Sequence, residues 1–397
     1  MKEDDEYLLP LYKRLDVSFV KGKKSILYDE EGKNYVDFTS GIGVNSLGYA
    51  NKEVVKTIKE QAKNILHTSN IYRIKSQEKC AKKIVELSNL NMQCFFCNSG
   101  AEANESAIKL ARKYGNTEFA KPKYKIITIN NSFHGRTIAT LKATAQEDKH
   151  KFFGPYPDGF VYAKDINEAI TLIDESTVAV MLELIQGEGG IFMQDVHKIK
   201  ELETILKSKK LLLIIDEVQT GVYRSGNFLI SQYFGIKPDI ITLAKGLATG
   251  IPIGVMMSSL KNIFKAGDHG STFGGNHMST TVCTKVLDIL EEYLNSGKLG
   301  VNIKYFNNYL HYFVEKYPSL FLQKNGWGFM QGLVLNDENI LDEIVKESLK
   351  KGVLVLKSGK NIIRFLPALN ISKKEIKQGF ERFESSLIEI LKEEKRK

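Results

Sequence analysis

The middle of this 397-residue chain alternates short apolar runs with amphipathic stretches. The short runs predict buried strands, and apolar residues spaced three and four apart predict helices. We predict strands at 94–97, 125–129, 178–184, 211–215, 240–243 and 254–257. We predict helices before them at 54–62 and 77–87, and between them at 102–114, 196–209 and 228–233. This alternation predicts an α/β fold with a doubly wound, mostly parallel central sheet flanked by helices.

The two ends of the chain have a different pattern. Residues 26–29 and 34–38 flank a polar turn, which predicts a hairpin. The remaining predicted elements are helices at 282–294, at 303–316 and from Lys373, with strands at 329–335 and 353–356. We therefore predict an N-terminal segment (1–53) that packs with a smaller C-terminal α+β domain (291–397), and a large domain (54–290) between them.

Composition limits the classes of protein and partner. With 43% hydrophobic residues the chain can form a full core, and no apolar run approaches the ~18 residues of a membrane span. Residues 2–6 are all charged, unlike a secretory leader, so we expect a cytoplasmic protein without a membrane partner. The formal charge of +9 comes from scattered lysines, which favours a solvated surface over a nucleic-acid partner.

Cys94 and Cys97 form a C-x-x-C pattern, which could indicate a redox or zinc site. On a strand, however, residues three apart point to opposite faces and cannot share a metal ion without a bend. Two buried small hydrophobic side chains are the simpler interpretation, so we expect no metal.

Two predicted strands end in ionisable residues. Asp216 follows the apolar run 211–215, and Lys245 follows 240–244. If these are neighbouring parallel strands joined by a helix, both side chains lie at the sheet edge where open α/β folds bind ligands. Pyridoxal 5'-phosphate would suit the pair, because its protonated ring nitrogen pairs with an aspartate and its aldehyde takes a lysine as a Schiff base. The alternative, a nucleotide hydrolase, requires a phosphate loop G-x-x-x-x-G-K-[ST], and this sequence has none.

Four loops next to predicted strands carry further candidates. Residues 98–102 precede a helix whose N-terminus could bind a phosphate, although Ser99 and Glu102 could equally form a capping box without a ligand. Phe133 could stack on a planar ring and Arg136 could bind a carboxylate, unless 132–137 is a plain surface turn. The glycine-rich loops 183–190 and 269–276 do not by themselves indicate a particular ligand.

Together these stretches resemble the class III, fold-type I pyridoxal phosphate-dependent aminotransferases, most closely those that act on acetylornithine. The resemblance is carried by residues 95–105, 133–137, 186–190, 216–221 and 270–276. It implies that Lys245 holds the cofactor and shuttles a proton, and that Asp216 pairs with the ring nitrogen. The other implied cofactor contacts are Ser99, Gly100, Ala101, Phe133, Val218, Gln219 and, from a neighbouring subunit, Thr272.

The resemblance also implies the substrate contacts and the reaction. Arg136 would bind the substrate α-carboxylate near Ser271, and Arg364 would bind a second carboxylate or pair with Glu188. The implied protein is a homodimer with shared sites that transfers the δ-amino group of N2-acetylornithine to 2-oxoglutarate in arginine biosynthesis. Alternatives within the fold are aminotransferases for ornithine, succinylornithine, succinyldiaminopimelate or 4-aminobutyrate, and a glutamate-1-semialdehyde aminomutase.

Overall fold

A computed structural model describes residues 7–359 and 361–394. The charged start of the chain, on which the expectation against a leader rests, lies outside the described residues. Among the helices that are described, none combines the length and the apolar character needed to cross a membrane.

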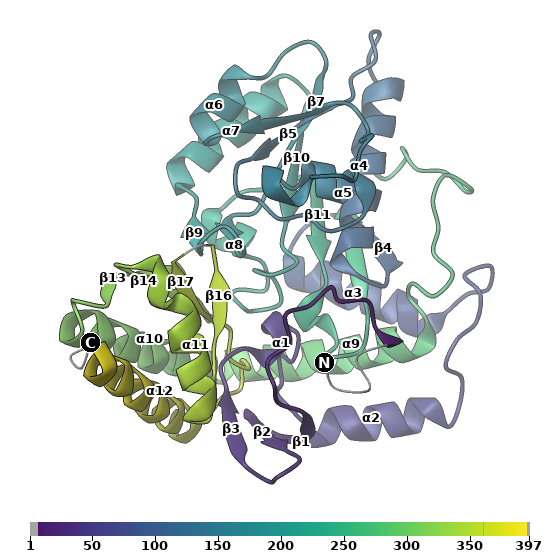
Figure 1. The fold of residues 1–397 in the computed structure, drawn as a ribbon. Coiled ribbons are helices and arrows are strands. Elements are labelled where there is room, and N and C mark those ends of the chain that lie inside the picture. Colours follow the sequence, from purple (N-terminus) through teal and green to yellow (C-terminus); the bar gives the residue numbers. More distant parts are fainter. Residues whose placement is uncertain (1–6, 360, 395–397) are drawn as a thin grey trace.

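A seven-stranded sheet forms the centre of the molecule (Figure 1). Its strands, in spatial order, are β4 (Gln93–Cys97), β12 (Gly254–Ser258), β11 (Ile240–Leu243), β10 (Leu212–Asp216), β7 (Thr177–Leu182), β5 (Lys125–Ile129) and β6 (Phe160–Ala163). β12 pairs antiparallel with both of its neighbours, and the pairs among β11, β10, β7, β5 and β6 are parallel. The predicted mostly parallel sheet is confirmed, and β6 is a strand that the sequence analysis missed.

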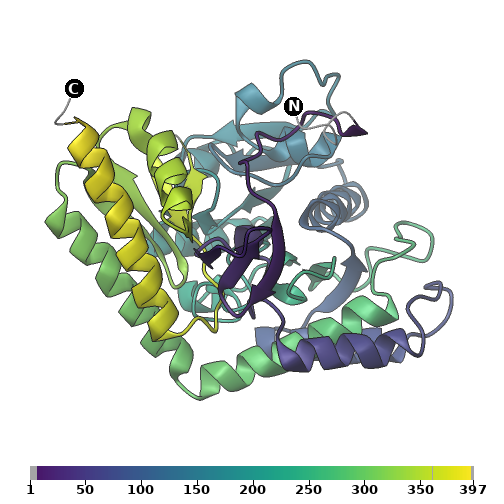
Figure 2. The ribbon, with the colours of Figure 1, turned by 60° about the horizontal axis from the view of Figure 1, so that its bottom comes forward.

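Helices cover both faces of this sheet, which explains why its strands are apolar on both sides. The helices of this part are α2 (Lys52–Ala62), α3 (Lys75–Ser88), α4 (Gly100–Thr117), α5 (Ile138–Ala143), α6 (Ile166–Thr171), α7 (Val196–Ser208), α8 (Ile230–Phe234) and α9 (His277–Asn295). On β10, Leu213 and Ile215 belong to the cluster that contains α7, whereas Leu212 and Ile214 belong to the cluster that contains α4. The long helix α9 lies alongside α2 (Figure 2).

The C-terminal part contains a second, antiparallel sheet. Its strands, in spatial order, are β13 (Phe321–Trp327), β14 (Met330–Leu335), β17 (Ile362–Phe365) and β16 (Leu356–Ser358). Its helices are α10 (Lys298–Lys316), α11 (Leu341–Lys350) and α12 (Lys373–Glu394). The predicted strand 353–356 is in fact two strands, since β15 (Val353–Leu354) leaves this sheet.

A third sheet joins the N-terminal segment to the C-terminal part. It consists of β1 (Phe19–Lys23), β2 (Ile26–Asp29), β3 (Asn34–Asp37) and β15, and β15 pairs parallel with β3. β2 and β3 form the predicted hairpin. The smaller elements are α1 (Ser40–Gly43), the strand pair β8 (Ile185–Gln186) and β9 (Phe192–Met193), and 3₁₀ helices η2 (Glu147–Lys149), η3 (Lys245–Leu247) and η4 (Glu338–Ile340). The predicted domain limits stay a prediction.

Candidate active site

Asp216 and Lys245 lie at one edge of the central sheet, as the sequence predicts. Strands β10 and β11 are neighbours and parallel, so their carboxyl ends meet. Both side chains line a cavity of about 430 Å³, a volume within the range of small-molecule sites. The N-terminus of α4 and the loop after β5 supply much of the remaining wall, so the cavity lies where open α/β sheets bind ligands.

Asp216 is buried and held by three hydrogen bonds. Its Oδ1 accepts from Val218 N at 3.0 Å, and its Oδ2 accepts from Asn104 Nδ2 at 2.7 Å and lies 2.8 Å from His134 Nδ1. Asn104 is itself fixed, because its Oδ1 accepts from Thr242 Oγ1 at 2.7 Å. The carboxylate is therefore locked in position at the cavity wall, where it suits a cationic ring nitrogen.

Lys245 opens η3, two residues after the end of β11, in an unusual conformation. Its φ of +38° lies in the left-handed region that non-glycine residues rarely adopt, and such strain often marks a functional position. Burial lowers the pKa of its amine, and Glu188, Asp216 and Glu183 oppose this effect only in part. A lowered pKa favours the neutral amine, which is the form that attacks an aldehyde.

The N-terminus of α4 faces the same cavity through Ser99, Gly100 and Ala101. The Ser99 side chain caps the helix by accepting from Glu102 N at 3.2 Å. The amides of Gly100 and Ala101 belong to the first turn, where N–H groups have no acceptor within the helix. A Cβ atom on Gly100 would lie 2.7 Å from Val218 Cγ1, so only glycine allows this close approach. Free N–H groups and the helix dipole suit a phosphate.

Phe133, Val218, Gln219 and Arg136 also line the cavity, which brings together nine of the predicted residues. The Arg136 guanidinium carbon lies 5.5 Å from the centroid of the Phe133 ring, and its side chain is exposed to solvent. Phe133 N donates to Glu183 Oε2 at 2.9 Å, which fixes the loop that carries the ring. The Phe133 ring and the solvent-exposed Arg136 guanidinium group therefore lie together in the cavity wall.

Glu188 and Arg364 form an ion pair beside the cavity. Arg364 Nη1 donates to Glu188 Oε1 at 2.5 Å and to Gly187 O at 2.9 Å. Burial disfavours the charge of Glu188, but Arg364, Lys245 and Lys149 outweigh this effect and lower the pKa of Glu188. Arg364 is buried on β17, whereas Glu188 is partly exposed in a glycine-rich loop. The acid is thus the partner better placed to move.

Ser271 and Thr272 are not among the residues that line this cavity. Ser271 Oγ accepts from Asn98 Nδ2 at 3.2 Å and from Gly274 N at 3.0 Å, so its contacts are with the cavity wall and its own loop. Thr272 is exposed. Their predicted roles therefore stay predictions.

Asn104, His134 and Glu183 line the cavity, but the sequence analysis gave them no role. Glu183 Oε1 also accepts from Gly187 N at 3.1 Å. Burial and the neighbouring Asp216 raise the pKa of Glu183 to about 7. His134 and Asn104 belong to motifs that the sequence analysis singled out, so the available signal was their closeness to Phe133 and Ser99 in the chain.

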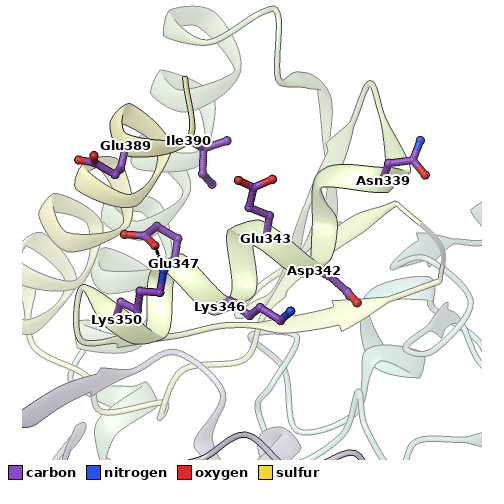
Figure 3. Close-up of a pocket in the computed structure, with 8 residues that line it drawn as sticks. All are labelled: Asn339, Asp342, Glu343, Lys346, Glu347, Lys350, Glu389 and Ile390. Carbon is purple, nitrogen blue, oxygen red and sulfur yellow. Dashed lines mark hydrogen bonds and ion pairs between the residues drawn. The ribbon is translucent and has the colours of Figure 1, made fainter. Parts of the chain in front are cut away.

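A second cavity, of about 440 Å³, lies between α11 and α12 (Figure 3). Charged side chains dominate its wall, and Glu347 pairs there with Lys350 at 2.8 Å. None of the predicted site residues lines it. Of the polar residues that line it, Glu347 alone is buried, whereas the first cavity has Asn104, His134, Glu183 and Asp216.

Cys94 and Cys97 are free, and burial raises the pKa of each thiol to about 12. A high pKa opposes the thiolate form that binds metals. Within 7–359 and 361–394, no group of three or more potential ligands could hold a metal ion. These observations fit the interpretation of the two cysteines as packed hydrophobic side chains.

Comparison with known proteins identifies the family. The model of the class III aminotransferases matches residues 11–387. The chain is 52% identical over 385 residues to the acetylornithine aminotransferase of Wolinella succinogenes, covering 97% of this chain and 98% of the relative. It is 45% identical over 390 residues to the enzyme of the same name from Aquifex aeolicus, covering 97% and 100%.

Solved structures agree with this assignment. The ornithine aminotransferase of Toxoplasma gondii has a TM-score of 0.91 at 28% identity, with coverage of 99% of this chain and 94% of that one. The N-acetylornithine aminotransferase of Stenotrophomonas maltophilia has a TM-score of 0.83 at 28% identity, with 98% of each chain covered. The chain belongs to the class III aminotransferases, which have the fold of type I pyridoxal phosphate-dependent enzymes.

Proposed function

We propose that the protein transfers the δ-amino group of N2-acetyl-L-ornithine to 2-oxoglutarate, which yields N-acetyl-L-glutamate 5-semialdehyde and L-glutamate. This is a step of arginine biosynthesis. The printed names of the relatives from Wolinella succinogenes and Aquifex aeolicus support the donor. The observation that carries the chemistry is the meeting of Asp216 and Lys245 in one cavity.

The described residues fit pyridoxal phosphate, which when bound supplies a ring that withdraws electrons from the substrate carbon. Asp216 would pair with the ring nitrogen, since two of its three hydrogen-bond partners are uncharged amides. Lys245 would hold the aldehyde and, once its amine is free, carry the proton at the substrate carbon. Its lowered pKa supports both roles.

The other contacts follow from the cavity wall. Ser99 and the amides of Gly100 and Ala101 would hold the phosphate. Phe133 and Val218 would lie on opposite faces of the ring, and Gln219 would contact its phenolic oxygen. Thr272 of a second copy would complete the phosphate site in a homodimer with shared sites. That dimer stays a prediction from the resemblance, and the cytoplasmic location stays a prediction from the composition of the chain.

Substrate binding would use the two arginines. Arg136 would bind the α-carboxylate of the donor, with Ser271 nearby. In the donor half-reaction Glu188 would neutralise Arg364, as the observed ion pair supports. In the second half-reaction a carboxylate of 2-oxoglutarate would replace Glu188 on Arg364, which lets one pocket accept both substrates.

The proposal is tested first on the purified protein. It should be yellow, and borohydride should bleach it and leave the cofactor attached to Lys245. Lys245→Ala should abolish turnover, and near-normal activity of this variant would contradict the proton-carrying role.

Kinetics then identify the donor. The kcat/KM for acetylornithine should exceed that for ornithine, succinylornithine, succinyldiaminopimelate and 4-aminobutyrate. A higher value for any of these would change the assignment within the family. Conversion of glutamate-1-semialdehyde without 2-oxoglutarate would indicate an aminomutase instead.

A further inference from the structure

Two cationic side chains, Arg136 and Lys149, lie near the Phe133 ring of the candidate site. The guanidinium carbon of Arg136 and Nζ of Lys149 lie 5.5 Å and 5.9 Å from the centroid of the Phe133 ring. Arg136 and Phe133 line the inner cavity. Lys149 lines a neighbouring groove of about 1210 Å³, which also contains Glu188. The sequence analysis did not single out Lys149.

The position of the Lys149 ammonium is fixed by a relay of hydrogen bonds. Lys149 Nζ donates to Gln146 Oε1. Gln146 Nε2 in turn donates to Ser132 O at 2.9 Å and to Asn131 O at 3.3 Å. These two carbonyl groups precede Phe133 in the chain, so one loop orients both the ring and the ammonium. A lysine held in this way is half-buried and preorganised, unlike a freely rotating surface lysine.

Next to the Phe133 ring the charged groups are the cations Arg136 and Lys149, whereas acids such as Asp148 and Glu188 line the wider groove. Burial and then Arg136 lower the pKa of Lys149, while Glu188 opposes this shift. Glu188 is itself 2.5 Å from Arg364, so its charge is shared with a second cation. A ligand that enters between Arg136 and Lys149 therefore meets two positive groups.

We propose that Lys149 determines specificity for the acylated donor, by binding the acyl oxygen and repelling a free α-ammonium group. The inference rests on the proposed function, in which Arg136 binds the donor α-carboxylate. In that pose the nitrogen on the α-carbon would lie next to the carboxylate held by Arg136, and Lys149 would approach it from its place beside the same Phe133 ring. An amide carbonyl there accepts a charge-assisted hydrogen bond, whereas the α-ammonium of ornithine is a third positive charge.

Three variants test this role. Lys149→Met removes the charge, Lys149→Arg keeps it, and Lys151→Met removes a charge from the same loop, where Lys151 pairs with Asp148 on the surface. The measured quantity is the kcat/KM for acetylornithine divided by that for ornithine. We expect Lys149→Met to lower this ratio about tenfold, the size of one charged hydrogen bond. Lys149→Arg and Lys151→Met should stay within about twofold of the wild type.

A binding measurement removes any dependence on turnover. N-acetyl-L-norvaline lacks the δ-amino group, so it reports on the α-end of the pocket alone. Calorimetric titration of the holoenzyme should give a Kd about tenfold higher for Lys149→Met and an unchanged Kd for Lys151→Met. An unchanged ratio and an unchanged Kd in a folded Lys149→Met protein would overturn the role of Lys149. Failure of the proposed function has a different signature, because the wild-type protein itself would then prefer an unacylated donor.

Discussion

Asp216 shows how a buried acid can be prepared for a cationic ligand. Val218 N and Asn104 Nδ2 satisfy lone pairs of its carboxylate without balancing its charge. His134 supplies the third contact, and its Nε2 atom is buried without a hydrogen-bond partner. The geometry thus fixes the carboxylate and leaves its charge largely for a ligand.

We predict that Asp216→Asn lowers kcat by about 10²- to 10³-fold, because loss of one partner from a buried ion pair costs roughly 3–5 kcal/mol. The amide has the same shape, so the fold should survive. Steady-state kinetics and circular dichroism check both points. Asp195→Asn, which changes an acid at the N-cap of α7 outside the cavity, is the control. A kcat within tenfold of the wild type would exclude charge pairing as the function of Asp216.

The lowered pKa of Lys245 predicts how the rate of covalent cofactor binding depends on pH. Its amine has a pKa below the ordinary value of 10.5, and the neutral amine is the reactive form. The rate at which the cofactor-free protein binds pyridoxal phosphate covalently should therefore rise with pH and reach half of its maximum below pH 10.5. Stopped-flow absorbance measures this rate. The unfolded chain binds more protons than the folded one between the two pKa values, so stability should also rise with pH there.

A rate that still climbed tenfold per pH unit up to about pH 10.5 would contradict a lowered pKa. The control is free Nα-acetyllysine, whose amine has no burial to shift it. Its reaction with pyridoxal phosphate should follow the ordinary lysine pKa of about 10.4.

At the scale of elements, the sequence predicts those helices and strands that the local pattern of apolar and polar residues determines. β10 and β11 are apolar at nearly every position. β10 ends in Asp216 and Lys245 follows two residues after the end of β11, so their place at one sheet edge follows from the parallel order. β12 runs antiparallel to both β11 and β4, a direction that no local pattern encodes. β6 is an edge strand in which only Phe160 and Ala163 are buried, so it has neither a fully buried run nor a period of two. The bonds of Asn104 and His134 to Asp216 require tertiary contacts, so sequence alone could not give their roles.

The N-terminus of α4 gives the prediction at this scale. Gly100→Ala places a Cβ 2.7 Å from Val218 Cγ1, so the first turn of the helix must move away from the loop after β10. We expect cofactor affinity to fall at least tenfold, since the amides of this turn would leave the phosphate. Fluorescence titration of the cofactor-free protein measures the Kd.

Gly300→Ala is the matched control for this substitution. Gly300 lies in α10, and apart from its chain neighbours and the backbone of its own helix no atom lies within 4 Å of its would-be Cβ. Alanine should therefore stabilise the helix by about 0.5–1 kcal/mol and leave cofactor affinity unchanged. Equal affinity of the two variants would argue against phosphate binding at α4.

At the scale of the whole molecule, exposed apolar side chains lie in the loop that carries Thr272 and in the segment bonded to it. Ile71 and Tyr72 are 87% and 70% exposed, and Phe273 is 60% exposed. Asn70 Nδ2 donates to Ser271 O at 3.0 Å and to Gly274 O at 2.9 Å, so both segments form one continuous surface. Large exposed apolar patches mark interaction sites, which supports the predicted homodimer.

We predict that Ile71→Asp weakens this dimer, because a carboxylate would be buried in the interface without a partner. Analytical ultracentrifugation should show dimers for the wild type and monomers for the variant at micromolar concentration. If Thr272 of one copy completes the phosphate site of the other, cofactor affinity should fall together with dimerisation. Leu322→Asp, at a 63% exposed position on β13, should change neither property. A monomeric Ile71→Asp protein with wild-type cofactor affinity would show that each subunit binds the phosphate alone.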